Sequence, residues 1–334
     1  MRQLGLRRAR PEALTIRRKR NGRGFVYLHK DNRRIRDPGT LKRLASLAVP
    51  PAYEDVMFAE DPALHLQAIG RDAAGRIQYR YHPDWQKVRE RRKARRLMRL
   101  VDVMPKIRRA VATRLGDLKP TKEFALAAVI DLVACSAIRA GSEAYARDNG
   151  TRGAATLLKS NVEIANNRVV LTFRAKRGQP VHKEVTSRRL AAAIRFLQSL
   201  PGRRLFQYRN GQGEICKVRR SEVNSYLREI AGVAVSLKDF RTLVASDLAL
   251  AKLAKTKPAG SERRRRSQVR EAVSAAAEEL ANTPAICRKS YVHESIVDAF
   301  ENGAVMKFAP KLGTGRSRAR REGVLAEILA QSES

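Results

Sequence analysis

The chain has 334 residues, 43% of them hydrophobic, which is enough for two globular cores. It carries 69 Lys and Arg against 33 Asp and Glu, a net charge of +36. Such self-repulsion is tolerated mainly when a polyanion neutralises it, so the expected partner is nucleic acid. A membrane surface is the alternative. However, no basic amphipathic helix with Trp or Phe, lipidation signal or bilayer-length apolar run is present, and no membrane partner is expected.

Cysteine and histidine spacing gives no sign of a metal site. Cys135, Cys216 and Cys287 lie far apart, and the five histidines lack ligand spacing. The arginine-rich beginning of the chain has no apolar core of a signal peptide, so we expect a cytoplasmic, nucleoid-associated protein.

Residues 1–24 are rich in arginine and predict a flexible basic arm. A small β-rich domain is expected over residues 25–88. Strand patterns lie at 25–28, 56–59, 64–70 and 77–81, with a short helix at 40–47.

The last of these strands alternates two kinds of side chain. Gln78 and Arg80 face one side, and Tyr79 and Tyr81 face the other. An amide that can bond adenine, with aromatic rings beside arginines, suits a sheet laid in a DNA groove. The pattern fits equally well if the two tyrosines are core residues.

A mainly helical domain is expected over residues 89–305. The basic run 85–99 predicts a connecting helix, Pro105 the start of the next, and residues 121–138 an apolar core helix. Arg139 directly follows that core helix, so its guanidinium should lie at the rim of the core and require an anion.

Three short strands, at 162–165, 169–173 and 181–185, predict a small sheet. The turn between the last two places Lys176 at a hairpin tip. There it is either a mobile charge that reaches into a groove or a solvated turn lysine. Helices are expected at 187–200 and 219–230.

The stretch from Leu237 to Thr242 opens another helix and places Arg241 next to apolar Phe240. A basic loop at 255–266 and a further helix follow. Thr283-Pro284 then has the cap-then-proline order of a helix start.

That last short helix delivers Tyr291, next to Arg288 and Lys289. Holding a phenol ionised at pH 7 costs roughly 4 kcal/mol unless nearby cations lower its pKa. Residues 306–334 predict a basic tail, either a DNA-binding extension or a disordered segment. The chain has no P-loop, no dinucleotide loop and no carboxylate cluster of the two-metal nuclease kind.

In this order and context, Arg139, Lys176, Arg241 and Tyr291 resemble the catalytic set of type IB DNA topoisomerases of the compact bacterial and poxvirus-like branch. The motifs that carry the resemblance are Ile138-Arg139-Ala140-Gly141 with Tyr145, Lys238-Asp239-Phe240-Arg241-Thr242, Asn282-Thr283-Pro284-Ala285, Ser290-Tyr291 and the strand Gln78-Tyr79-Arg80-Tyr81. It covers roughly residues 25–305.

The resemblance implies an α+β fold. A small β-rich N-terminal DNA-binding domain and a larger, mainly α catalytic domain with a short sheet would form a C-shaped clamp around duplex DNA. Gln78, Tyr79, Arg80, Tyr81 and Tyr145 would contact the DNA. The expected activity is relaxation of supercoiled DNA by a monomer without ATP, metal or any other cofactor.

The roles of the catalytic residues also follow from the resemblance. Tyr291 would form a 3'-phosphotyrosyl bond, Arg139 and Arg241 would hold the non-bridging oxygens, and Lys176 would protonate the leaving 5'-oxygen. Many family members have histidine where this chain has Asn282. An amide donates a hydrogen bond but carries no titrating proton, which leaves Tyr291 without a side-chain base.

Two other functions fit parts of the sequence. A tyrosine recombinase shares the catalytic core, but usually has His-x-x-Arg where this chain has Lys238-Asp239-Phe240-Arg241. A non-catalytic basic nucleic-acid-binding protein fits the composition and leaves the ordered catalytic set unexplained.

Overall fold

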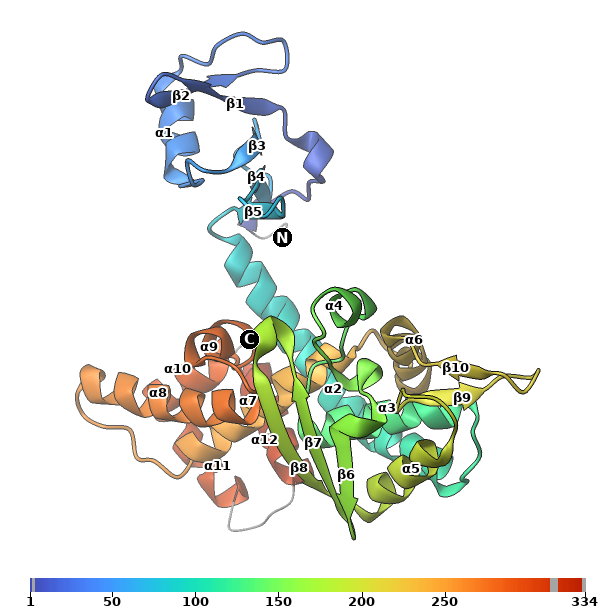
Figure 1. The fold of residues 1–334 in the computed structure, drawn as a ribbon. Coiled ribbons are helices and arrows are strands. Elements are labelled where there is room, and N and C mark those ends of the chain that lie inside the picture. Colours follow the sequence, from blue (N-terminus) through green and yellow to red (C-terminus); the bar gives the residue numbers. More distant parts are fainter. Residues whose placement is uncertain (2–3, 313–317, 332–334) are drawn as a thin grey trace. The chain divides into compact units, whose positions relative to one another are not determined.

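The computed structural model describes residues 1, 4–312 and 318–331. The chain divides into two compact units, Met1–Arg92 and Lys93–Ser334. The smaller unit is built on a sheet and the larger is mainly helical with a short sheet (Figure 1). The predicted α+β class is confirmed.

The smaller unit contains a five-stranded antiparallel sheet with strand order β2-β1-β3-β4-β5. Helix α1 (Pro38–Ser46) begins at Asp37, whose carboxylate accepts a hydrogen bond from the backbone N–H of Thr40 at 2.6 Å. The core of the smaller unit includes Ile16, Ile35, Leu44 and Phe58. The strands are β1 (Ile16–Asn21), β2 (Gly24–Leu28), β3 (Glu54–Phe58), β4 (Leu66–Arg71) and β5 (Ile77–Tyr81).

The prediction of a flexible arm over residues 1–24 is wrong for the segment that forms β1. This strand pairs with β2 and β3, and Leu14 and Ile16 are buried. Arg18 explains why an arginine-rich segment can be ordered. Its guanidinium donates to the carbonyls of Val49, Pro50 and Tyr53, so the chain itself satisfies these donors.

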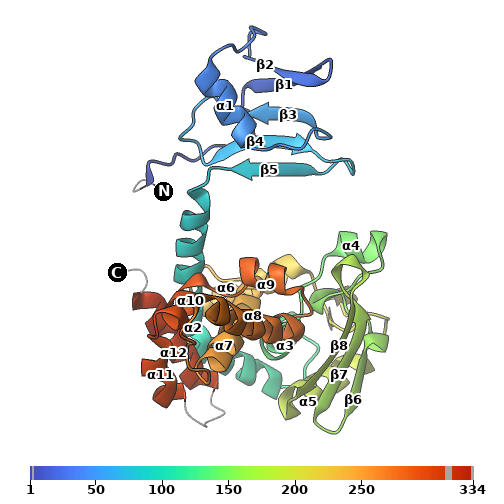
Figure 2. The same cartoon turned by 90° about the vertical axis from the view of Figure 1, so that its left-hand side faces the viewer.

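In the larger unit the α7–α12 helices gather on one side of the β6–β7–β8 sheet (Figure 2). The sheet strands are β6 (Val162–Ala165), β7 (Arg168–Arg174) and β8 (Pro180–Thr186), and a separate hairpin joins β9 (Gln207–Arg209) to β10 (Ile215–Lys217). Helix α2 (Trp85–Gly116) begins in the smaller unit and continues into the larger one. The other helices of the larger unit are α3 (Lys122–Ser136), α4 (Glu143–Asp148), α5 (Arg188–Ser199), α6 (Arg220–Ala231), α7 (Leu237–Leu253), α8 (Glu262–Glu279), α9 (Pro284–Ser290), α10 (Glu294–Glu301), α11 (Val305–Leu312) and α12 (Arg318–Gln331).

Helix α3 is the centre of this core, as predicted. Every residue from Phe124 to Val133 is buried, and the Thr121 hydroxyl caps the first turn by accepting from the Phe124 N–H at 3.2 Å. The helix ends because Ala137 takes a left-handed conformation, with φ of 52°. The chain therefore leaves the core abruptly, two residues before Arg139.

Pro105 does not begin a new helix, contrary to the prediction, because α2 runs through it. An internal proline costs about 3 kcal/mol because a backbone hydrogen bond is lost and the ring crowds the preceding turn. Burial offsets this cost, since Leu97, Leu100, Met104 and Ile107 all pack into the core at helical spacing.

For the predicted basic tail, the alternative of a disordered segment is wrong where the structure describes it, since α11 and α12 are helices of the larger unit. Glu322 is 2% exposed and pairs with Arg108 at 2.7 Å and Arg318 at 3.1 Å. Arg321 pairs with Asp247 on α7 at 2.8 Å. The prediction for residues 313–317 and 332–334 lies outside the described residues.

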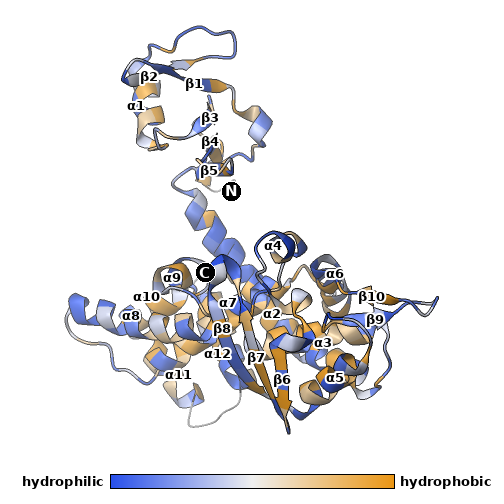
Figure 3. Cartoon of the chain, in the orientation of Figure 1, coloured by the Kyte–Doolittle hydropathy of each residue, from blue (hydrophilic) through white to orange (hydrophobic). Residues whose placement is uncertain are grey.

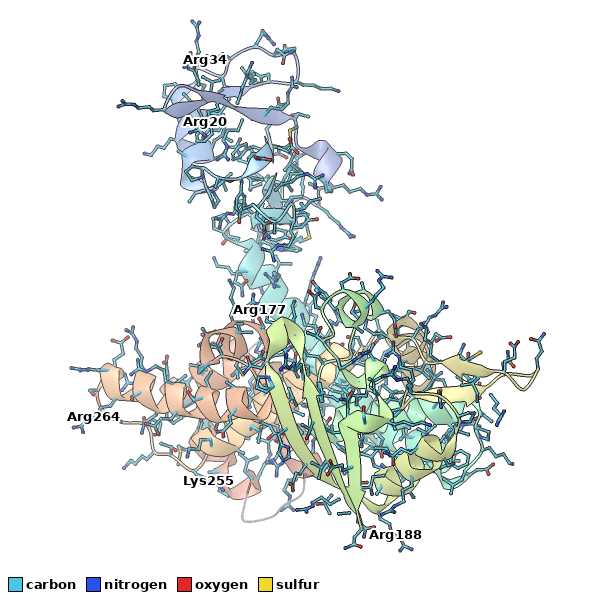
Figure 4. The ribbon with its side chains drawn as sticks, in the orientation of Figure 1. Arg20, Arg34, Arg177, Arg188, Lys255 and Arg264 are labelled. Atoms are coloured by element: carbon cyan, nitrogen blue, oxygen red, sulfur yellow. The ribbon has the colours of Figure 1, made fainter. Side chains whose placement is uncertain are left out.

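Each unit carries many exposed basic side chains. Hydrophobic residues concentrate around α3 and α5 in the interior of the larger unit (Figure 3). Across the described residues, no helix combines the length and the apolar composition needed to cross a membrane. Exposed basic residues labelled in Figure 4 are Arg20 and Arg34 on the smaller unit and Arg177, Arg188, Lys255 and Arg264 on the larger.

Candidate active site

One cavity of about 570 Å³ in the larger unit collects most of the residues predicted to be catalytic. Arg139, Lys176, Arg241 and Tyr291 line it, together with Tyr145. Among the described residues, none of those lining it is an aspartate or glutamate. Its cationic residues are Arg139, Arg152, Lys176, Arg220, Lys238 and Arg241. Six cations without a carboxylate make this cavity a site for an anion.

Arg139 is held by a close backbone contact rather than by a helix. A Cβ atom on Gly153 would come within 2.5 Å of the Arg139 carbonyl oxygen, so only glycine fits there. The Ala154 N–H donates to that same carbonyl at 2.8 Å. Gly141, with φ of 88°, then turns the chain into α4. The Arg139 backbone is thus fixed from both sides.

Arg241 is 3% exposed and lies on α7. Its guanidinium donates to the carbonyls of Ala137 and Leu280, in the latter case at 2.9 Å. Its Nε is buried and makes no hydrogen bond within the described residues. Burial lowers the pKa of Arg241 below its ordinary value. A buried cation with one unused donor is well suited to bind an anionic oxygen.

Tyr291 terminates the short helix α9, whose predicted start is confirmed. Thr283 caps the helix by accepting from the Ile286 N–H at 3.3 Å, and Pro284 occupies the first turn. The Ser246 hydroxyl donates to the Tyr291 carbonyl at 3.2 Å. Contacts with the backbone thus position the residue and leave its phenol available to the cavity.

The Arg241 guanidinium lies over the Tyr291 ring, with Cζ 4.9 Å from the ring centroid. Burial raises the pKa of the Tyr291 phenol, but the charge and hydrogen bonding of Arg241 act in the opposite direction. Arg139 and Lys238 add to that lowering, and the net pKa lies below the ordinary value.

The cations next to Tyr291 in the sequence are not the ones that act on it. We expected Arg288 and Lys289 to lower its pKa. Arg288 instead forms a two-pronged ion pair with Glu294, at 2.7 and 2.5 Å. The cations that lower the pKa come from other parts of the chain.

Asn282 does not line the cavity, but its side chain contacts Arg139, which does. The Arg139 guanidinium donates to the Asn282 side-chain oxygen. The Asn282 amide nitrogen is buried and has no hydrogen-bond partner among the described residues. The carboxamide therefore orients Arg139 while keeping an N–H donor unused.

Lys176 lies in the turn between β7 and β8, as predicted. The tip of this hairpin lies beside α4 (Figure 1, Figure 2). The Lys176 Nζ is 5.8 Å from the ring centroid of Tyr145, which is 52% exposed. Lys176 is exposed and also lines the cavity.

The residues predicted to bind DNA in β5 belong to the smaller unit. Tyr79 and Tyr81 are 45% and 40% exposed, so their interpretation as core residues is wrong. Their rings stack with centroids 6.2 Å apart. Gln78 donates to Asp72 at 2.8 Å, and Arg80 to the carbonyl of Ala48 at 2.9 Å. The tyrosines thus offer an accessible aromatic surface.

Sequence reasoning missed Arg152, Arg220 and Lys238 as residues of the cavity. In a chain with 69 Lys and Arg, a single basic residue carries little information about its position. The only available signal was that Lys238 and Arg241 are three residues apart at the start of one helix, and so share a face.

Comparison with known proteins agrees with this fold. Residues 82–309 match the family described as eukaryotic DNA topoisomerase I, catalytic core. Residues 24–72 match the bacterial DNA topoisomerase IB N-terminal domain. A DNA topoisomerase 1B of Acanthamoeba polyphaga mimivirus is 30% identical over 294 residues, which cover 86% of this chain and 88% of that protein.

The chain belongs to the type IB DNA topoisomerase family. It is therefore an enzyme whose substrate is DNA. The two alternatives, a recombinase and a non-catalytic binding protein, are not supported, because the matches extend over both the catalytic and the N-terminal part of the chain.

Proposed function

We propose that the enzyme relaxes supercoiled duplex DNA by cutting and rejoining one strand through Tyr291. The phenolic oxygen attacks a backbone phosphorus, the bond from phosphorus to the 5'-oxygen breaks, and a 3'-phosphotyrosyl bond forms. The single observation that carries this proposal is the position of the Tyr291 ring under Arg241, in a cavity lined by cations.

Arg139 and Arg241 bind the non-bridging oxygens of the phosphoryl group. The arginine fork matches two oxygens, and the unused Nε of Arg241 provides a further donor. Each such donor contributes about 3 to 4 kcal/mol to lowering the barrier, by analogy with oxyanion holes. Asn282 orients Arg139 and offers its own N–H to the same group.

Proton transfer completes the step. Lys176 gives its proton to the departing 5'-oxygen, which becomes a free hydroxyl. Tyr291 loses its proton to water, helped by the cations that lower its pKa. Rejoining reverses each transfer. Because one phosphodiester replaces another of similar energy, we expect the reaction to need neither ATP nor a metal ion.

DNA binding is assigned to both units. In the smaller unit we propose that the exposed Tyr79 and Tyr81, with Gln78 and Arg80, contact the duplex. In the larger, catalytic unit, Tyr145 does the same.

We further propose that the enzyme acts as a monomer in the cytoplasm, associated with the nucleoid. The DNA substrate of the family supports the nucleoid assignment.

The covalent bond can be located by peptide mapping. The substrate is a duplex whose cleaved strand is fluorescently labelled at its 5' end and whose downstream fragment is short enough to dissociate. After cleavage, the enzyme should remain bound to the 3' end of the upstream fragment, which carries the label. After trypsin digestion, the label should lie on the peptide of residues 290–307, which contains Tyr291 as its only tyrosine. A label on residues 140–147, which contain Tyr145, would reject the assignment.

The cleavage rate should depend on pH through the Tyr291 phenol. Because its pKa is lowered, the single-turnover rate should rise with pH and level off below about 10, the value for a free phenol. Lys238→Gln removes one of the lowering charges, so its plateau should begin at higher pH. Lys252→Gln, an exposed lysine on the same helix, is the matched control. Identical profiles for all three proteins would contradict the electrostatic account.

A further inference from the structure

A second and larger cavity, of about 1000 Å³, is also walled by α4. Glu143, Ala146 and Arg147 of this helix line it, whereas Tyr145 lines the catalytic cavity. We call the second cavity the α4 pocket. Its cationic lining residues are Arg147, Arg152, Arg203, Arg204, Lys217 and Arg219.

The α4 pocket has more cations than its own carboxylates can neutralise. Each of its two carboxylates, Glu143 and Glu222, has a cationic partner, and the Oε1 atom of Glu143 is buried without a hydrogen-bond partner within the described residues. Glu143 pairs with Arg204 at 2.6 Å, and Glu222 pairs with Lys122, a residue outside the lining, at 2.5 Å. Arg147 pairs with Asp148 at 2.9 Å. Within the part of the chain that the structure describes, no side-chain hydrogen bond or ion pair is found for Arg152, Arg203 or Arg219.

A bound anion would relieve an unfavourable environment at two arginines of the pocket, Arg204 and Arg152. The Nη1 atom of Arg204 is buried and has no hydrogen-bond partner within the described residues. Arg152 is half-buried, and burial together with the nearby charges of Arg204 and Arg203 lowers its pKa. Buried donors without partners and mutually repelling cations both cost stability until an anion binds.

The α4 pocket lies next to the catalytic cavity. Arg152 lines both. At the start of α6, neighbouring residues divide between them: Arg219 lines the α4 pocket, and Arg220 lines the catalytic cavity. A nucleic-acid strand carries one phosphate for about every 3.4 Å of helix axis, so a strand held at Tyr291 would bring further phosphates to such a neighbouring site.

We propose that the α4 pocket binds a phosphate group, and that its source is the backbone of the DNA strand held in the catalytic cavity. This inference rests on the proposed function, because it takes the catalytic cavity to hold a DNA phosphate. Arg203 and Arg219 supply cations, although the charge of Arg219 also acts on Glu222, and Arg152 lines both cavities. A free oligophosphate would offer the same chemistry from a different source.

The test uses the full-length chain with Tyr291→Phe, which measures binding without cleavage. Into this parent we introduce Arg203→Gln with Arg219→Gln, the pocket variant. The matched control carries Arg188→Gln with Arg264→Gln, two exposed arginines that do not line the pocket and lie at the start of α5 and on α8 (Figure 4). Both variants lose the same net charge.

Duplex affinity is then measured against salt. For the pocket variant, the plot of log affinity against log salt concentration should be less steep by about 0.9 for each phosphate that it no longer neutralises. Between 50 and 200 mM salt, its loss of affinity should then be about 3.5-fold smaller than that of the parent. The control should keep the parent slope. Single methylphosphonate linkages near the cleavage site provide a second measure. At one position the neutral linkage should weaken binding by the parent but not by the pocket variant.

A free-phosphate arm follows thermal stabilisation by tripolyphosphate. If only the pocket variant loses this stabilisation while its DNA slope equals that of the control, the phosphate site stands and the backbone source is overturned. If the pocket variant matches the control in both arms, the proposal is overturned. Neither arm requires cleavage, so failure of Tyr291 as nucleophile would be seen separately, in the peptide map.

Discussion

Tyr291→Phe is expected to reduce DNA relaxation below detection while leaving DNA affinity within about tenfold of the original protein. The phenylalanine ring keeps the packing under Arg241 but lacks the oxygen that would bond to phosphorus. The backbone contacts from Ser246 and Cys287 do not depend on the hydroxyl. Plasmid relaxation and fluorescence anisotropy with a labelled duplex measure the two properties.

Tyr145→Phe is the matched control, because Tyr145 lines the same cavity and we assign its ring, not its hydroxyl, to DNA contact. It should still relax DNA. If Tyr291→Phe still became covalently attached to DNA, the nucleophile would have to be another residue.

Arg241→Ala and Arg139→Ala should each slow single-turnover cleavage about 10²- to 10³-fold, the usual effect of removing one donor to a developing oxyanion. The two should differ in stability. Arg241 donates to the carbonyls of Ala137 and Leu280 inside the core, so its removal leaves two buried acceptors unpaired. We expect about 2 to 4 kcal/mol lower free energy of unfolding for Arg241→Ala.

Arg139 is more exposed than Arg241, and its guanidinium donates to the side chain of Asn282 rather than to buried carbonyls, so Arg139→Ala should change stability much less. Urea unfolding measures the loss of stability separately from the loss of cleavage rate. Arg188→Ala controls for the removal of a surface charge. A near-normal cleavage rate for either variant would remove that arginine from the site.

The parts of the fold with regular hydrophobic patterns were predictable from the sequence. The strand at Ile77–Tyr81, the core helix around Phe124 to Val133 and the helix start at Thr283-Pro284 all follow from local periodicity and capping. The strand at Ile16–Asn21 was missed because its arginines mask the alternation, and distant carbonyls satisfy one of them. Pro105 was misjudged because burial, a tertiary effect, outweighs its local cost.

In the candidate site, too, some features were predictable from the sequence and others depend on tertiary packing. The order of Arg139, Lys176, Arg241 and Tyr291 along the chain indicated the chemistry through resemblance to a family. The sequence did not reveal which cations act on the phenol, because that depends on which helices pack together. Arg288 is three residues from Tyr291 in sequence but pairs with Glu294, whereas Arg241, fifty residues away, lies over the ring.

The central claim is that a phenol and fixed cations exchange one phosphodiester for another with no outside energy source. Incubation of positively and negatively supercoiled plasmids with the enzyme, in EDTA and without nucleotide, tests it most directly. We predict complete relaxation of both. Relaxation only after ATP or a divalent metal ion is added, across a range of salt concentrations, would contradict the account.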